Sequence, residues 1–171
     1  MYSTVKKIMF NQKTIIFFIL LPFVNATLAT GLDHQRFGDI YFGTELSSSQ
    51  LTYKAISQKI EGCHYIVFDQ YPTVSVMIID DVIQRIETSD FGFINSNNPF
   101  YEVITNGKPF NKLNMDRQDI DIEEHEYEYG FYFRWYNNAK TRAIIIDYVD
   151  GKVDIIKAGL LPAAMWIEGC A

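Results

Sequence analysis

The pattern of hydrophobic and polar positions predicts two short helices. In the first, Leu46-Ser47-Ser48-Ser49-Gln50-Leu51 has the form of a capping box, with Ser47 as the N-cap. Gly62 is a stop signal, and the apolar stripe between them has helical spacing: Leu51, Ala55, Ile56 and Ile60. The second helix is predicted over Phe100–Thr105, because Asn98-Pro99 can start it and Asn106-Gly107 can end it.

Segments with a period of two predict the strands of an antiparallel sheet. These segments are Asp39–Gly43, Tyr65–Phe68, Val74–Ile79, Val82–Glu87, Tyr127–Trp135, Arg142–Tyr148 and Val153–Lys157. Asp80-Asp81 and Asp150-Gly151 are typical of hairpin turns, and the polar stretch 108–118 predicts a loop. The pattern therefore favours an α+β domain in which two helices pack on one face of an antiparallel sheet.

The order of these elements predicts a tandem duplication over residues 37–90 and 91–171. Each half would contain a short strand, a helix and three antiparallel strands. Phe37-Gly38-Asp39-Ile40 is echoed by Phe91-Gly92-Phe93-Ile94, and the hairpin around Asp80-Asp81 is echoed by the one around Asp150-Gly151. Chance similarity is the alternative, because the matching stretches are short.

Residues 1–29 have the three parts of a secretory signal peptide. Three lysines and no acidic residue accompany the apolar run Ile15–Leu21, and small residues follow it. We predict cleavage after Ala26 or Ala29, which leaves residues 30–171 as a single exported domain. A membrane anchor is the alternative, but the apolar stretch runs for about ten residues, whereas a spanning helix needs about 20.

Charge narrows the choice of partners. The 171-residue chain has 15 Lys+Arg and 21 Asp+Glu, a formal charge of −6, which becomes −9 when the three leader lysines are removed. Such a surface repels phosphate groups, so we expect neither nucleic-acid binding nor electrostatic binding to anionic lipids. No second apolar run approaches spanning length, so no integral membrane segment is expected after signal cleavage. No oligomeric state is assigned.

The two cysteines, Cys63 and Cys170, predict one disulfide. Each follows Glu-Gly, and an even pair in an exported domain is typical of a cross-link. Two buried free thiols are the alternative. A redox pair would favour a C-x-x-C spacing, and two cysteines with three scattered histidines do not form the ligand set of a metal site.

Catalytic motifs are missing from the sequence. It contains no nucleophile elbow, no phosphate-binding loop and no dinucleotide-binding glycine motif, so no catalytic residue, metal ligand or cofactor is predicted. His125-Glu126-Tyr127-Glu128-Tyr129 comes close to the H-E-x-x-H motif of zinc hydrolases. However, Tyr129 stands where the second histidine is required.

An acidic run occupies residues 119–128. Asp119, Asp121 and Glu123 alternate with isoleucines and would share one face of a strand. We interpret the run as the charged, solvated edge of the sheet, which discourages edge-to-edge association. Calcium binding is one alternative, although no glycine-bearing loop accompanies the acids. A hydrolase that uses paired carboxylates is the other.

The aromatic strand after this run predicts a contact surface. Residues of one parity are all aromatic and are expected in the core: Tyr127, Tyr129, Phe131, Phe133 and Trp135. The other parity would then be displayed as the candidate contact surface: Glu126, Glu128, Tyr132, Arg134 and Tyr136. Tyrosine and arginine are favoured in protein interfaces. Simple cross-strand pairing on a solvent face is the alternative.

Several short motifs resemble a group of small exported bacterial proteins of unassigned function. The matching stretches are Phe42–Leu46, Gly62–Tyr65, Met77–Ile86, His125 with Tyr127, Gly130 with Tyr132, and Glu168-Gly169-Cys170-Ala171. The repeated unit also resembles the beta-lactamase-inhibitor-protein-like fold, which small outer-membrane assembly lipoproteins share. The chain departs from those lipoproteins because it lacks an acylated cysteine. It departs from the exported group at Asn95-Ser96-Asn97, where a glycine-containing turn is usual.

These observations favour a non-catalytic binding protein, periplasmic or secreted, that recognises another protein or an envelope component. An envelope-assembly accessory protein is the first alternative, and it rests on the resemblance to lipoprotein architecture alone. A hydrolase that uses the acidic run is the second.

Overall fold

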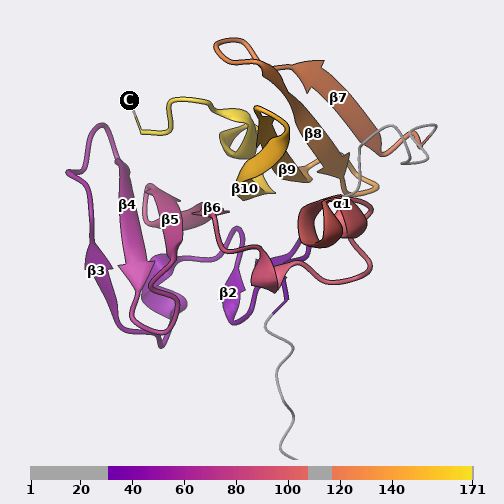
Figure 1. Ribbon diagram of the computed structural model, residues 1–171. Coiled ribbons are helices and arrows are strands. Elements are labelled where there is room, and N and C mark those ends of the chain that lie inside the picture. Colours follow the sequence, from indigo (N-terminus) through magenta and orange to yellow (C-terminus); the bar gives the residue numbers. More distant parts are fainter. Residues whose placement is uncertain (1–30, 108–116, 171) are drawn as a thin grey trace, which may run out of the picture.

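The computed structural model describes residues 31–107 and 117–170, which form an eight-stranded antiparallel sheet and a small hairpin (Figure 1). The predicted leader, with both cleavage positions, and most of the predicted loop 108–118 lie outside the described residues. The hairpin consists of β1 (Arg36–Phe37) and β2 (Ile40–Tyr41). The large sheet consists of β3 (Tyr53–Ala55), β4 (Cys63–Phe68), β5 (Val74–Ile79), β6 (Val82–Thr88), β7 (Ile120–Glu124), β8 (Gly130–Tyr136), β9 (Arg142–Val149) and β10 (Lys152–Leu160).

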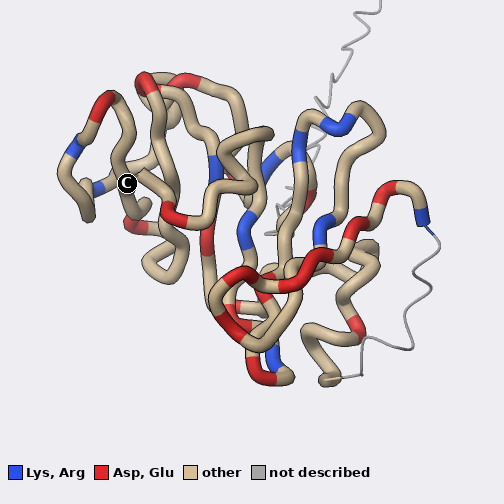
Figure 2. Tube along the Cα trace, turned by 90° about the horizontal axis from the view of Figure 1, so that it is seen from above, with Lys and Arg blue, Asp and Glu red and all other residues tan. Residues whose placement is uncertain are grey.

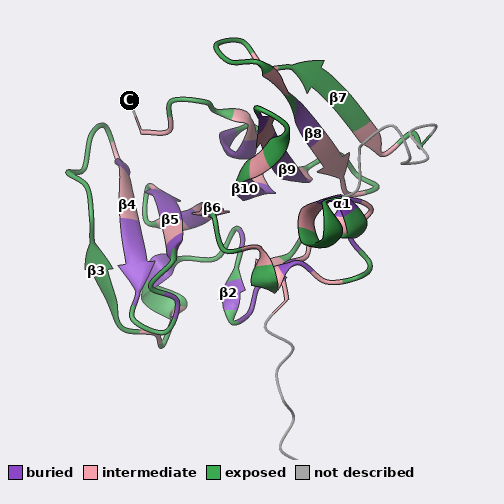
Figure 3. Cartoon of the chain, viewed as in Figure 1, coloured by how far each residue is buried: buried purple, intermediate pink, exposed green. Residues whose placement is uncertain are grey.

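The large sheet has the strand order β3-β4-β5-β6-β10-β9-β8-β7. It therefore consists of two four-stranded meanders, β3–β6 and β7–β10, which join where β6 pairs with β10. The two edge strands, β3 and β7, are mostly exposed, whereas the central strands are buried (Figure 3). A duplication over residues 37–90 and 91–171 stays a prediction.

Tight turns connect the last two strands of each meander. Asp80 and Asp81 join β5 to β6 with φ values of 49° and 63°, and Asp150 and Gly151 join β9 to β10 with φ values of 50° and 79°. Two consecutive residues with positive φ are typical of type I′ turns, whose twist matches that of the flanking strands. Both turns lie where the sequence predicts hairpins.

One face of the sheet packs against the N-terminal hairpin and the helical segments to form the main core. Those segments are η1 (Leu46–Ser48), η2 (Phe91–Phe93) and α1 (Tyr101–Asn106). The core residues from the sheet alternate along its strands, as the two-residue period requires. Phe100, just before α1, is fully buried, and its ring centroid lies 5.7 Å from that of Phe133 on β8.

The opposite face is covered at its centre by residues 161–170, which we call the C-terminal segment. It contains η4 (Ala163–Met165), which contacts β6, β9 and β10. Ala163 and Ala164 are buried against this face, and small side chains allow the segment to approach the strands closely. The central strands are thus covered on both faces.

The predicted fold class is wrong. The protein is mostly β, with 45% strand and 11% helical residues, and α1 is the one α-helix that the described residues contain. The second predicted helix exists as α1, displaced by one residue, and Gly107 ends it in the left-handed conformation with a φ of 61°. The first predicted helix is absent, so no pair of helices packs on the sheet.

Instead of that helix, the segment forms the single 3₁₀ turn η1, which includes Ser47, and then strand β3. Tyr53–Ala55 pairs with β4, and the N–H of Ile56 donates to the carbonyl of Tyr65. Ile56 and Ile60, two residues of the predicted apolar stripe, are 49% and 51% exposed. Because Ile56 and Ile60 remain exposed, a helix here would gain little from packing, and the segment pairs with β4 instead.

Candidate functional site

The covered face of the sheet carries a buried arginine that binds the C-terminal segment. Arg85 on β6 is 1% exposed, and its Nη1 donates to the carbonyls of Ala163, at 2.7 Å, and Trp166, at 2.6 Å. Its Nη2 donates to the Tyr65 hydroxyl at 2.6 Å and forms an ion pair with Glu87. These bonds join β6 to the C-terminal segment, so the role of this arginine is structural.

The hydroxyl of Tyr65 completes the arginine cluster. It donates to Glu87 Oε1 at 2.7 Å, and burial, followed by this bond to Glu87, raises the pKa of Tyr65 to about 12. The tyrosine is therefore neutral at physiological pH and acts as a fixed hydrogen-bond donor.

The disulfide between Cys63 and Cys170 is present, as the sequence predicts. It joins the first residue of β4 to the end of the C-terminal segment, with the two Cα atoms 5.4 Å apart. Arg85 and the disulfide thus hold the C-terminal segment to the sheet at two separate places.

The predicted contact surface is only partly displayed. Glu126 and Glu128 are exposed, but Tyr132 is 4% exposed, and Arg134 and Tyr136 are partly buried. The prediction that Tyr132 is displayed is wrong because the C-terminal segment packs on this face of the sheet. Tyr132 clusters there with Ala143 and Ile145 of the neighbouring strand β9 and with Ala164 of η4.

The predicted aromatic core of the same strand is also only partly correct. Phe133 is 2% exposed and belongs to the main core, and Trp135 packs against it. Phe131 is 40% exposed, and Tyr127 and Tyr129 are 71% and 88% exposed. The last two residues precede the first residue of β8 and therefore do not follow the alternation of the strand.

Tyr127 and Tyr129 belong to residues 125–129, which connect β7 to β8 and which we call the acidic turn. The turn is closed by His125, whose backbone N–H donates to the carbonyl of Gly130 at 3.0 Å. The His125 Nδ1 atom accepts hydrogen bonds from the backbone N–H groups of Tyr127, at 3.2 Å, and Glu128, at 3.1 Å. The turn is therefore ordered from within, although residues 126–129 are exposed.

The other ring nitrogen of His125 anchors the turn to the sheet. His125 Nε2 lies 2.8 Å from the Tyr132 hydroxyl and 3.5 Å from Asp147 Oδ1 on β9. The rings of His125 and Tyr132 stack with their centroids 4.5 Å apart. Burial raises the pKa of Asp147, and burial followed by the nearby Asp147 raises the pKa of Tyr132 to about 12. Tyr132 is thus a buried support of the turn and not a contact residue.

Acidic residues follow one another along β7 and through the acidic turn, at one edge of the sheet (Figure 2). Arg134 forms ion pairs with Asp121, at 3.6 Å, and with Glu123, and Arg117 binds Asp119. In the part of the chain that the structure describes, the remaining acids of this run have no ion pair: Glu124, Glu126 and Glu128. We call β7 together with the acidic turn the acidic end.

The acidic run does not form a metal site in the described residues. Among residues 31–107 and 117–170, no three side chains of His, Cys, Asp or Glu converge closely enough to hold a metal ion. The strand geometry and ion pairing account for this, because Asp121 and Glu123 share one face but are paired with Arg134, whereas Glu124 has the opposite parity.

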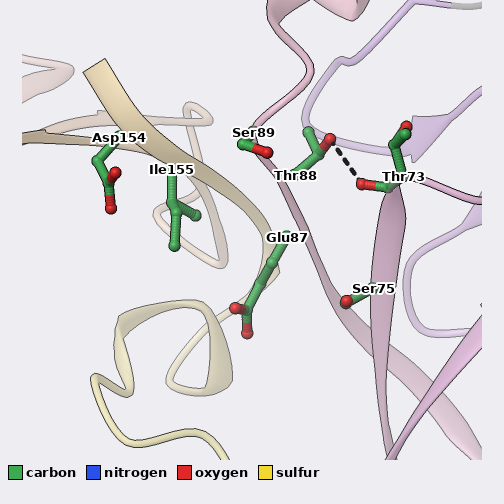
Figure 4. A pocket seen from close by; sticks show the side chains of 7 residues that line it. All are labelled: Thr73, Ser75, Glu87, Thr88, Ser89, Asp154 and Ile155. Atoms are coloured by element: carbon green, nitrogen blue, oxygen red, sulfur yellow. Dashed lines mark hydrogen bonds between the residues drawn. The ribbon is translucent and has the colours of Figure 1, made fainter. Parts of the chain in front are cut away.

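A polar surface cavity of about 360 Å³ lies between β5, β6 and β10 (Figure 4). Glu87 and Asp154 line it together with the hydroxyl groups of Ser75 and Ser89. Glu87 is the counter-ion of Arg85. No histidine is among the residues that line this cavity.

No helix within the described ranges is both long and apolar enough to cross a bilayer. Comparisons with family models, with curated proteins and with solved structures found no match to this chain. The resemblance to small exported proteins and to the beta-lactamase-inhibitor-protein-like fold therefore stays a prediction. The functional conclusion rests on the residues themselves.

Sequence reasoning missed the role of His125, which it considered only as one of three scattered histidines and as part of an incomplete zinc motif. A signal was present, because a histidine followed by four residues and then Gly130 places a side-chain acceptor at the start of a tight connection. Short polar side chains that accept from the backbone two and three residues later stabilise such turns.

Proposed function

We propose that this protein is an exported binding protein, periplasmic or secreted, which recognises another protein or an envelope component without catalysing a reaction. The observation that carries the proposal is the pair Tyr127 and Tyr129, 71% and 88% exposed beside Glu126 and Glu128. Tyrosine offers a large contact area at a low entropic cost and is enriched among the residues that dominate interfaces.

The order of the acidic turn supports a binding role. Two backbone bonds to the ring of His125 and the bond from His125 to Tyr132 hold the turn before any partner arrives. A surface that is already ordered loses less conformational entropy when it binds. The exposed tyrosines are therefore presented in a defined arrangement.

The charge of the acidic end indicates a partner with a basic surface. Glu126 and Glu128 have no ion pair with a described residue, and the exported part carries a formal charge of −9. Opposite charge on the partner would speed association and would make it sensitive to salt. Export itself is supported by the leader pattern in residues 1–29 and by the Cys63–Cys170 disulfide.

The two alternatives have less support. An envelope-assembly accessory role rests on the resemblance alone, and no contact in the described residues favours it. A hydrolase would need carboxylates placed across a cleft. Asp121 and Glu123 are instead paired with Arg134 at the sheet edge.

The test is site-specific cross-linking in cells that export the full chain. A photo-reactive residue in place of Tyr129 should form an adduct with one defined partner. The same group in place of Tyr53, which is 49% exposed on β3 at the opposite edge, is the matched control and should not. Mass spectrometry identifies the adduct.

The partner found in this way is then used for affinity measurements. Replacing Tyr127 and Tyr129 by serine should raise Kd at least about tenfold, because tyrosine hot spots contribute about 2 kcal/mol or more. Glu126→Gln with Glu128→Gln should reduce the salt dependence of Kd. Equal adducts at Tyr53 and Tyr129, or an unchanged Kd, would reject this surface, and an outer-membrane complex as the adduct would favour the assembly role.

A further inference from the structure

The hydrogen bonds of His125 define its protonation state. A backbone N–H can only donate, and the N–H groups of Tyr127 and Glu128 both point at Nδ1, at 3.2 and 3.1 Å. Nδ1 is therefore an acceptor and carries no proton. In a neutral imidazole the other nitrogen then carries the proton, so Nε2 donates to the Tyr132 hydroxyl, 2.8 Å away.

A second proton on this ring is incompatible with the turn. It has to bind Nδ1, because Nε2 already carries one. Two N–H donors would then face a third N–H at hydrogen-bond distance, which removes both turn bonds and replaces them by repulsion. The side chain is only 8% exposed, so water cannot satisfy the new donor in place. The closed turn and the charged ring thus exclude each other.

Charged and titratable groups lie against the ring or against the two side chains that it contacts. Tyr132 on β8 and Asp147 on β9 contact the ring itself. Glu126 of the turn and Arg134 on β8 act on Tyr132, and Glu128 of the turn with Asp154 and Lys157 on β10 act on Asp147. Glu123 and Glu124 on β7 directly precede His125 in the chain. The acids attract a charged imidazole, and Asp147, 3.5 Å from Nε2, does so most directly. None of them relieves the conflict in the closed turn, because Nδ1 is enclosed by the two backbone donors.

We infer that His125 makes the acidic turn a pH-sensitive element, which is closed while the imidazole is neutral and opens when the ring takes a second proton. Histidine is the side chain that ordinarily changes charge between about pH 5 and 8. Opening releases the backbone that carries Tyr127 and Tyr129, and it places a positive ring among the acids of the turn. If this turn is the binding surface, as the proposed function holds, then partner affinity falls on acidification.

The test measures the turn without any partner. In the full oxidised chain, amide hydrogen exchange followed by NMR gives protection factors for Tyr127 and Glu128 at about pH 7.5 and about pH 5. We expect both factors to fall at least about tenfold at the lower pH, in step with the titration shifts of the His125 ring protons. Amides of β9 should keep their protection.

His125→Asn is the matched variant. The Asn side-chain oxygen occupies the place of Nδ1 and accepts from the backbone two residues later, but it does not titrate. The turn of this variant should remain protected at both pH values. Unchanged protection of Tyr127 and Glu128 in the natural protein would overturn the inference, and so would an equal loss in His125→Asn.

Failure of this inference is distinguishable from failure of the proposed function. Protection that does not respond to pH, together with a partner that still cross-links at Tyr129, rejects the pH response and leaves the binding role. Protection that falls as expected, with no adduct specific to Tyr129 at either pH, rejects the binding role and leaves the pH response.

Discussion

The two meanders of the sheet have the same strand connections but use their charged residues differently. In the first meander, β3–β6, the charged cluster around Arg85 is enclosed beneath the C-terminal segment. In the second, β7–β10, the acids of β7 lie at an open edge, where Asp121 and Glu123 are 57% and 50% exposed at their side chains. The cover of a strand, and not its connections, decides whether its charges are enclosed in the fold or exposed to solvent.

Two arginines illustrate this difference. The Nη1 and Nη2 atoms of Arg85 donate to two backbone carbonyls, a tyrosine and one carboxylate, all within the protein. Arg134 pairs with two carboxylates that remain half in water. Removing the first leaves Glu87, whose side chain is 20% exposed, without its counter-ion, whereas removing the second leaves charges that water can solvate.

The strongest test of the comparison is therefore to replace each arginine by methionine. Arg85→Met should lower the free energy of unfolding by about 3–5 kcal/mol, because the charge of Glu87 and two carbonyls lose their buried partner. Arg134→Met should cost about 1 kcal/mol or less, since the carboxylates of Asp121 and Glu123 are half exposed and water can solvate them. Urea denaturation of both oxidised variants measures the difference. Equal losses would show that the cover of the strand does not separate the two roles.

A second pair of variants locates the boundary between the core and the acidic end within β8. Phe131 and Phe133 share one face of the strand, but Phe133 is 2% exposed and Phe131 is 40% exposed. Phe133→Ala should cost about 3–5 kcal/mol through a core cavity. Phe131→Ala should cost about 1 kcal/mol, the value of one aromatic contact. Urea denaturation again compares the two variants. A larger loss of stability for Phe131→Ala would show that this boundary is not where the exposure of the two rings places it.

Local patterns predicted the parts of the fold that depend on neighbours in the sequence. The hairpin turns at Asp80-Asp81 and Asp150-Gly151 require only residues that accept positive φ, and α1 requires only its stop signal at Gly107. The disulfide followed from the compartment. Each of these features is specified within a few residues or by composition.

The first helix was mispredicted because this segment pairs with a strand that lies outside the local sequence window. A capping box favours a helix locally, but Tyr53–Ala55 pairs with Ile66–Phe68, and no local pattern reports that pairing. Isolated short helices are marginal in water, so a strand partner is enough to replace one.

The burial of Arg85 was not predicted because strand β6 contains a bulge. Met77 pairs with Arg85, but Ile78 pairs with Ile83, so β6 has one extra residue at this place. The bulge turns Ile83 and Ile86 to the core and Arg85 to the other face, which strict alternation cannot anticipate. The exposure of Tyr127 and Tyr129 was missed for a related reason, since alternation was continued beyond the start of β8.

The smallest expected effect concerns pH and the start of the acidic end. Arg117 donates to both carboxylate oxygens of Asp119, at 2.9 and 2.5 Å, and the indole N–H of Trp135 donates to Oδ2 at 2.9 Å. The Arg117 bonds outweigh the opposing effect of burial and, with the Trp135 bond, lower the pKa of Asp119 to about 2. An ordinary aspartate has a pKa of about 3.9, so the ionised form is favoured by folding.

A carboxyl whose pKa is lower in the folded state stabilises the protein above its unfolded pKa and loses that contribution as pH falls towards the folded value. Stability should therefore decrease between about pH 4 and about pH 2, and Asp119→Asn should be less stable at neutral pH with a shallower decrease over that interval. Urea denaturation across this range, followed by tryptophan fluorescence, measures both. Asp121→Asn is the control, because its carboxylate contacts Arg134 at 3.6 Å and remains 57% exposed, so its slope should match the natural protein more closely. If Asp119→Asn keeps the full slope, then acid sensitivity arises elsewhere and β7 is not tied to the core through Trp135.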